Sequence, residues 1–475
     1  MAELTARLSQ SWLSMRIRRS DLAWTLAIGG LGAIVVVAAL KYSFQASCAV
    51  VLIVLVVAIY RHDRSWGIVA LFAFWFLAPE IRRLLELLTG YVSTDPLSLA
   101  PFLATAALAG VELSRSKLPP TARRVLLLAA AGFAFGLPVG VLHPSAALYA
   151  FVAYLAGVSG AVLGFCEPRL LQRSGLRRIV LFGMVPIALY GLVQHVLQLP
   201  SWDQAWLDAT GVTSIGTTST GTVRVFATLN APGALAPLLG LSVLCYLTVR
   251  GHRSLAAIGF AVVGVTLALT FVRSAWVALA AGALAHVIAS RGTSARRVLG
   301  VAAIALAATL ALSPVSHTAR DVVNRFTTIG SPGSDTSATA RTATLGATLP
   351  TAVTAPVGHG LGSAGEPTKL TADTSLRAPD NGYLSLLYQV GPVGFILVVL
   401  AILLMLRAAW NGARARAPGQ DLRLLLFSMF VLLLVSLVSG DDFYGSLGVI
   451  FWFIGGQALA FQHAQRTRGA ATASL

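Results

Sequence analysis

Two arginines at the borders of apolar segments are the first candidates for chemistry. Arg224 comes shortly before Asn230 and Pro232, residue types suited to the cap and first turn of a helix. Arg273 lies in a connection with almost no loop between two apolar segments. Guanidinium groups bind phosphate oxygens through paired hydrogen bonds, and a helix N-terminus also attracts anions. The two arginines together predict a phosphate site at a membrane surface, whereas a single interfacial arginine often has only a structural role.

A polar stretch over residues 314–381 holds most of the other candidates. It is too polar to cross a membrane, and it contains Arg341, a glycine-rich turn around His359, and Asp380 near its end. A carboxylate or an imidazole can remove the proton of an attacking hydroxyl group, so Asp380 is the first and His359 the second candidate for a general base. Asp380 is equally suited to capping the helix that follows. The glycines indicate a tight turn whose backbone approaches a ligand or another helix.

The expected site therefore combines groups for catalysis with groups for binding an anion or a sugar. The candidates for catalysis are Asp380, His359, Arg224 and Arg273. The candidates for binding a diphosphate or a glycan are Arg224, Arg273, Arg341, Asn381, Tyr383 and Arg377. The histidines are scattered without the spacing of a metal site, so no metal and no cofactor are expected.

The elements that must position these residues are membrane helices. A hydrophobic fraction of 56% and a charged fraction of 11% exclude an ordinary soluble domain. The apolar runs do not alternate as the strands of a membrane barrel do. The sequence thus predicts an all-α polytopic membrane protein with about 12–14 transmembrane helices and one large external loop domain. The three cysteines, in or beside apolar runs, indicate no disulfide framework.

The net charge of +17 is a topology signal. Most arginines and lysines fall in the loops on the same side as the N-terminus, and this asymmetry predicts cytoplasmic N- and C-termini and an external site, not nucleic-acid binding. The first apolar run is long and followed at once by another, so no cleavable signal peptide is expected. The predicted segments are a basic cytoplasmic arm (1–21), transmembrane helices with short loops (22–313), a large external loop (314–381), C-terminal transmembrane helices (382–462) and a cytoplasmic tail (463–475).

Two further charged pairs have structural interpretations. Arg82 and Arg83 are external in this topology, and we expect them on an interfacial helix after Pro79, with both charges in water or one of them on an anionic lipid. Asp441 and Asp442 stand at the turn between the last two apolar runs. Two adjacent carboxylates alone hold a cation poorly, so we expect both to be solvated.

With these residues placed, the chain resembles the O-antigen ligase and polysaccharide polymerase superfamily of bacterial membrane glycosyltransferases. The similarity in motifs covers residues 180–400. The family often has His-Asn where this chain has Asp380-Asn381. The matching elements are Arg224 with Asn230-Ala-Pro232-Gly233, Arg273-Ser274, Arg341, Gly358-His-Gly-Leu-Gly362, and Asp380-Asn381-Gly-Tyr383-Leu384 with Gly391-Pro-Val-Gly394.

The resemblance implies a GT-C-like fold in the bacterial inner membrane. It implies transfer of a glycan from an undecaprenyl-diphosphate carrier to an acceptor sugar hydroxyl on the outer face, without a metal or a nucleotide sugar. Family arginines at the positions of Arg224 and Arg273 handle the lipid diphosphate, and direct attack would invert the anomeric carbon. The implied partners are the polyprenyl-diphosphate-linked donor, a glycan or glycolipid acceptor, membrane lipid and other envelope polysaccharide assembly proteins.

Three alternatives stay open at this point. The sequence does not separate a ligase, which moves a finished glycan to a terminal acceptor, from a polymerase, which extends a repeat unit. A flippase or exporter of lipid-linked oligosaccharide would also need arginines for the diphosphate, but it is expected to show two related halves and charges lining an internal cavity. A peptidoglycan-type polymerase on a similar scaffold is the third alternative.

Overall fold

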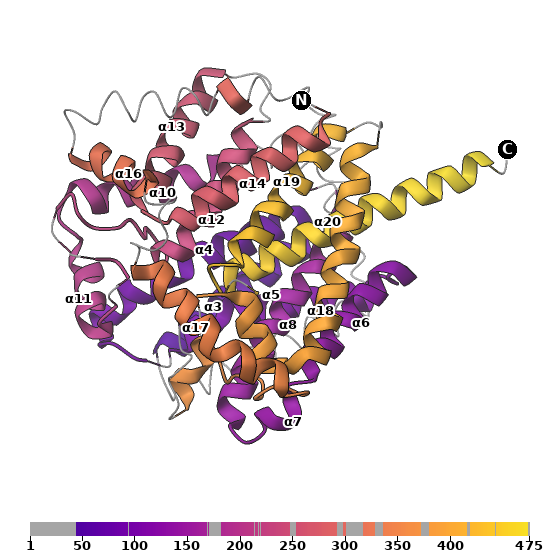
Figure 1. Ribbon diagram of the computed structural model, residues 1–475, viewed down its shortest axis with the longest axis horizontal. Coiled ribbons are helices and arrows are strands. Elements are labelled where there is room, and N and C mark those ends of the chain that lie inside the picture. The colour runs from indigo at the N-terminus through magenta and orange to yellow at the C-terminus, as the bar shows by residue number, and fades with distance from the viewer. Residues whose placement is uncertain are drawn as a thin grey trace, which may run out of the picture.

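The computed structural model describes residues 44–473, apart from short gaps. These gaps are residues 94, 169, 171–181, 213, 217, 219, 248–252, 292–297, 301–316, 328–335, 372–379, 416–418 and 442. The basic arm, the first apolar run and Arg377 therefore lie outside the described residues. Within the described part the secondary structure is helical, without a strand, which confirms the predicted all-α class (Figure 1).

Many neighbouring helices are joined by short connections, but a long connection, which contains Arg224, separates α11 from α12. In chain order they are α3 (Phe44–His62), α4 (Arg64–Thr89), the 3-10 helix η1 (Pro96–Ser98), α5 (Ala100–Arg115), α6 (Pro120–Ala134), α7 (Leu137–Gly140), α8 (Pro144–Cys166), α10 (Met184–Val196), α11 (Ser201–Thr210), α12 (Pro232–Leu247), α13 (Arg253–Leu269), α14 (Arg273–Ala289), α16 (His317–Thr327), α17 (Thr336–Thr354), the 3-10 helix η5 (Glu366–Leu370), α18 (Gly382–Arg414), α19 (Gln420–Ser436) and α20 (Gly445–Ala473).

Within the described part of the chain, five stretches of helix are long and apolar enough to cross a membrane, so the protein is a multi-pass membrane protein. They are Phe44–His62, Pro120–Gly140, Pro144–Cys166, Gly382–Arg414 and Gly445–Thr467. Shorter apolar helices include α10, α12, α13 and α14. The total of 12–14 spans and the GT-C-like architecture remain predictions.

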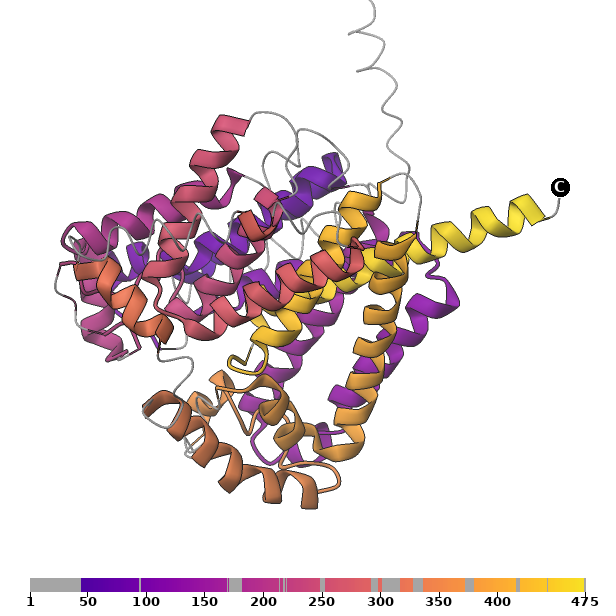
Figure 2. The same cartoon turned by 45° about the horizontal axis from the view of Figure 1, so that its top comes forward.

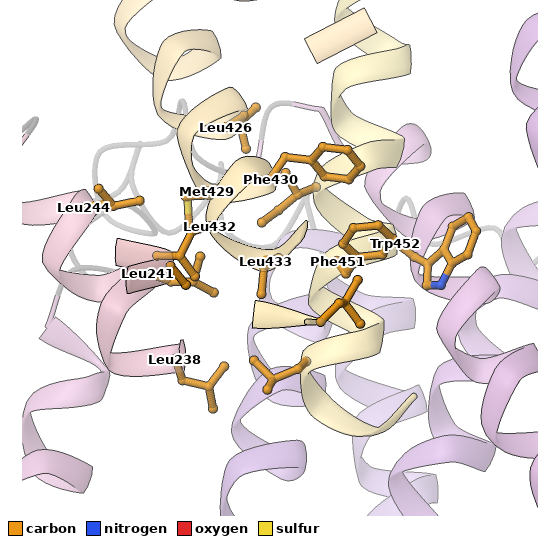
Figure 3. Close-up of a cluster of buried hydrophobic side chains, with 14 of the residues drawn as sticks. Leu238, Leu241, Leu244, Leu426, Met429, Phe430, Leu432, Leu433, Phe451 and Trp452 are labelled. Carbon is orange, nitrogen blue, oxygen red and sulfur yellow. The ribbon is translucent and has the colours of Figure 1, made fainter. Parts of the chain in front are cut away.

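The core lies where α12, α19 and α20 meet. Figure 3 shows the leucine-rich faces of α12 and α19 turned toward each other, with aromatic rings of α19 and α20 beside them. The buried side chains labelled there are Leu238, Leu241, Leu244, Leu426, Met429, Phe430, Leu432, Leu433, Phe451 and Trp452. Helix α8 packs along α20, and Gly160 of α8 allows this close approach because a Cβ there would meet the Val449 carbonyl. The far end of α20 projects away from the other helices (Figures 1 and 2).

Helix α4 corrects one expectation. It runs without interruption through Pro79 and carries Arg82 and Arg83 on its last turns, so no separate interfacial helix begins after the proline. Neither arginine is in water or available to a lipid, because Arg82 is 8% and Arg83 1% exposed. Arg82 pairs with Glu86, and Arg83 pairs with carboxylates described below. Burial of an arginine requires such partners. Glu86 and Glu80 lie on α4 itself, whereas Asp203 lies on α11.

Within the described residues, the predicted external loop contributes three helices that pack against different parts of the fold. Helix α16 contacts α13, whereas α17 contacts α18 and η5 contacts α8. Between α17 and η5, the chain makes the glycine-rich turn that the sequence predicts. His359 N donates to the Tyr388 carbonyl at 2.8 Å, and Gly360 N donates to the Gln389 carbonyl at 3.2 Å. The turn approaches another helix, at the point where Gly391 interrupts α18 with a φ of 70°.

Replacing Gly358 by alanine is expected to destabilise this turn by roughly 2 kcal/mol or more. Gly358 has a φ of +72°, and a Cβ there would overlap the Gln389 carbonyl. The measurement is thermal unfolding of the purified protein in detergent. Gly346→Ala is the matched control, since Gly346 lies in α17 with open space at its Cβ position. Equal melting temperatures for Gly358→Ala and Gly346→Ala would contradict the predicted overlap with the Gln389 carbonyl.

Candidate functional site

Arg224 is held by the backbone of two neighbouring segments. Its Nε donates to the Thr270 carbonyl at 3.1 Å and its Nη1 donates to the Ser214 carbonyl at 2.8 Å. The backbone N of Val225 donates to the Leu269 carbonyl at 3.1 Å. The chain around Arg224 is thereby attached to the C-terminal end of α13. The guanidinium group keeps unused N–H donors in this arrangement, because it has five and these contacts take up two.

Arg273 begins α14, just beyond the carbonyl that Arg224 contacts. The connection between α13 and α14 is so tight that Phe271 adopts a left-handed backbone with a φ of 53°. A non-glycine residue is held in this region only where its surroundings determine it, and such residues gather at functional sites. The predicted hairpin therefore exists, and it brings Arg224 and Arg273 to one place.

Two more arginines join them from the external loop. Burial lowers the pKa of Arg224, and the positive charges of Arg325, Arg273 and Arg341 lower it further. The guanidinium groups of Arg273, Arg325 and Arg341 therefore lie within electrostatic range of Arg224. The repulsion among them is relieved when an anion binds, which favours a polyanion such as a diphosphate.

Arg325 was missed by sequence reasoning. It lies on α16, a helix that packs near α13, and that packing is a tertiary contact with no local signal in the sequence. The strongly two-faced pattern of residues 317–327 indicates a surface helix but not its partner.

Asp380 lies beside this group of arginines. Its Oδ2 is 3.6 Å from Arg341 Nε, with side chains 57% and 39% exposed, respectively. Asp380 itself has a left-handed backbone with a φ of 47°. The helix cap is formed by Asn381, whose side-chain oxygen accepts from Leu384 N at 3.0 Å. The alternative role of Asp380 as the cap is therefore wrong, and its carboxylate remains accessible.

His359 and Tyr383 have contacts of another kind. The His359 ring stacks on Tyr388, with centroids 4.0 Å apart and planes 1° apart, and its buried Nδ1 has no hydrogen-bond partner among the described residues. Tyr383 donates its hydroxyl to the Leu434 carbonyl at 2.8 Å, on α19. No contact in the described part of the chain joins His359 to Asp380. Their roles toward a substrate remain predictions, as does that of Asn381.

Asp441 is not the solvated turn residue that we expected. Its Oδ2 accepts from Ser385 Oγ at 2.7 Å and from the Tyr444 hydroxyl at 3.3 Å, while Oδ1 is buried without a hydrogen bond. Removal of the carboxyl group from water raises the pKa of Asp441 to about 7. Asp442 lies outside the described residues. Among the described side chains, no three from His, Cys, Asp and Glu lie close enough together to hold a metal ion.

Asp441→Asn is expected to stabilise the protein at alkaline pH. A carboxyl that titrates near 4 when unfolded and at about 7 when folded contributes stability that is complete below pH ~4 and lost as the pH rises through about 7. Asparagine keeps an acceptor for Ser385 and is neutral throughout. The melting temperature of the variant relative to wild type should therefore rise between pH ~5 and pH ~8.5. Asp208→Asn, at an exposed site, is the control. If the melting temperature of Asp441→Asn relative to wild type falls between these pH values, the raised pKa of Asp441 is refuted.

The fold and the site define the class of protein as a multi-pass helical membrane protein with arginines near one another beside the end of α13. In comparison with known proteins, residues 255–399 match the family model described as O-Antigen ligase. This match confirms the resemblance stated from the motifs, and it indicates an enzyme of the ligase or glycosyltransferase kind that acts on lipid-linked glycans. The matched region contains Arg273, Arg325, Arg341 and Asp380, whereas Arg224 precedes it. No curated protein matches the chain.

Proposed function

We propose that the protein transfers a glycan from a polyprenyl-diphosphate carrier to an acceptor sugar hydroxyl at the outer face of the bacterial inner membrane. The observation that carries this proposal is the gathering of Arg224, Arg273, Arg325 and Arg341 around one region, with the carboxylate of Asp380 beside it. A lipid diphosphate brings its charge to the membrane surface, where arginines at the ends of apolar helices can bind it.

The reaction exchanges one C–O bond for another. The acceptor oxygen forms a bond to the anomeric carbon, and the bond from that carbon to the diphosphate breaks with its electron pair leaving on the diphosphate. Negative charge therefore grows on the leaving group while the sugar becomes oxocarbenium-like. Arginines fixed before the reaction stabilise that charge without reorganising, and no metal or cofactor is required.

The proton of the acceptor hydroxyl must go to a base. Asp380 is the first candidate, because its carboxylate is exposed and lies at the edge of the group of arginines. Arg341 keeps this carboxylate oriented by their ion pair. His359 is the second candidate. Direct attack by the acceptor inverts the configuration of the anomeric carbon.

The test is a transfer assay with purified protein, an undecaprenyl-diphosphate-linked glycan and candidate acceptors in EDTA. Release of the carrier diphosphate with a lengthened glycan supports a polymerase, and transfer to a terminal acceptor supports a ligase. In proteoliposomes, movement of the intact lipid-linked glycan between leaflets without release of the diphosphate would instead establish a flippase. All three readouts start from the same donor. A polymerase, a ligase and a flippase each give a different product from it.

A further inference from the structure

The segment that carries Arg224 needs support from other parts of the chain. Residues 223–226 are neither helix nor strand, and a turn follows at Ala227 and Thr228. A segment of this kind has no hydrogen-bond ladder to fix the direction of its side chains. On the N-terminal side, the Val223 carbonyl lies 2.8 Å from His195 Nδ1. Within the segment, Arg224 N donates to the Ile215 carbonyl at 3.0 Å and Val225 N to the Leu269 carbonyl. On the C-terminal side, Thr228 Oγ1 donates to the Phe76 carbonyl at 2.7 Å, and the Ala227 peptide is bound by two further side chains.

Gln194 of α10 pairs with both backbone groups of Ala227. Its Oε1 accepts from Ala227 N at 2.7 Å, and its Nε2 donates to the Ala227 carbonyl at 3.2 Å. The same Nε2 donates to Asp203 Oδ2 at 2.7 Å, which fixes the orientation of the amide. Gln194, Asp203 and Ala227 are each 0% exposed. Water does not compete for these hydrogen bonds, so each is costly to lose.

Arg83 of α4 also binds the Ala227 peptide. Its Nη2 donates to the Ala227 carbonyl at 2.9 Å, and its Nη1 lies 3.0 Å from Asp203 Oδ1. The guanidinium also lies over the ring of Phe226, at 5.1 Å from the centroid. Arg83 is paired with Glu80 as well. It is therefore buried and balanced by carboxylates, and its Nη2 binds the backbone of Ala227.

Ala227 has a backbone conformation that needs this support. Its φ is 49°, in the left-handed region, which costs a non-glycine residue free energy. Side chains of α4 and α10 contact this one peptide, and Asp203 of α11 binds both of those side chains. The turn at Ala227 sets the direction of the preceding residues, and Arg224 is three positions away. The network thus acts on the backbone that aims the arginine.

We propose that Gln194, oriented by Asp203, is a positioning residue that holds the Ala227 peptide in its left-handed conformation and so aims Arg224 at the diphosphate. The proposal rests on the proposed function, since it takes the diphosphate as the anion that Arg224 meets. Gln194 contacts only protein groups and acts through Arg224.

The test compares Gln194→Leu with wild type by two readouts, the transfer rate and the binding of inorganic pyrophosphate to the purified protein. We expect each to fall about tenfold, with the detergent-solubilised protein still folded. Gln204→Leu is the matched control, because the Gln204 side chain donates to the exposed Asp208 of the same helix, α11. Pyrophosphate binding that is unchanged in Gln194→Leu would overturn the proposal even if the transfer rate falls.

A double-mutant cycle separates positioning from general stability. In the Arg224→Ala background, Gln194→Leu should lower pyrophosphate binding no further, because the residue acts through Arg224. Additive losses would overturn the proposal.

Ala227→Gly supplies a rescue, since glycine adopts a positive φ without the cost that alanine has. It should restore part of the pyrophosphate binding lost in Gln194→Leu. If wild type binds pyrophosphate but transfers no glycan, the proposed function fails while these binding measurements still decide the role of Gln194.

Discussion

Replacement of Arg224 by alanine is expected to lower the rate of glycan transfer at least tenfold while the protein remains folded, and Arg273→Ala should do the same. A tenfold loss corresponds to about 1.4 kcal/mol of activation free energy, which is small for a charge-assisted contact with a leaving diphosphate. Arg224 is half-buried and lies close to three other arginines, so its interaction with an anion is screened less than at an exposed surface. The measurement is kcat/KM in the transfer assay.

Two comparisons make this result specific. Arg115→Ala removes an exposed arginine at the end of α5 and should leave the transfer rate unchanged. Arg224→Lys keeps the positive charge but loses the fork that holds two phosphate oxygens, so its rate should lie between those of wild type and Arg224→Ala. Rates equal to wild type in both alanine variants would refute the role of the arginines.

Asp380→Asn is expected to lower transfer about a hundredfold, more than His359→Ala, because loss of a general base typically costs two orders of magnitude or more. Asparagine has nearly the same shape and cannot accept the proton. The carboxylate of Asp380 is exposed beside Arg341, whereas His359 stacks against Tyr388 in a turn that packs on α18. The measurement is again kcat/KM, with thermal unfolding to verify the fold.

His359→Ala also removes the ring that stacks on Tyr388. The kcat/KM of this variant is therefore compared with its melting temperature. Any loss of activity that parallels a loss of folded protein belongs to the turn and not to the chemistry. A folded His359→Ala variant with a larger loss than Asp380→Asn would move the general base to His359.

The sequence was sufficient to predict those parts of the site that lie at the ends of apolar segments. Arg224, Arg273 and Asp380 each stand where a long apolar run begins or ends. If these runs span a membrane, the three residues are expected at the same membrane surface, and this follows without knowledge of any tertiary contact. Arg341 could be assigned to the same side from the polarity of the external loop. The structure adds that these residues also lie near one another.

Features that depend on contacts between distant segments could not be predicted. Arg83 is external in the predicted topology, and although Glu80 lies on the same helix, its buried partner Asp203 lies on α11, a contact that no local pattern predicts. Arg325 likewise depends on how α16 packs. Asp380 and Asn381 are both good caps, and only the hydrogen bond to Leu384 N shows which one is used. The turn around His359 was consistent with a ligand or a helix until its hydrogen bonds to α18 were seen.

The most direct measurement of the central claim is the affinity of the purified protein for undecaprenyl diphosphate in EDTA, for wild type and for the double variant Arg224→Gln/Arg273→Gln. If the gathered arginines bind the carrier's diphosphate, the double variant should bind at least about a hundredfold more weakly, and wild type should prefer the diphosphate to undecaprenyl monophosphate. Equal affinity in wild type and the folded double variant would contradict this claim.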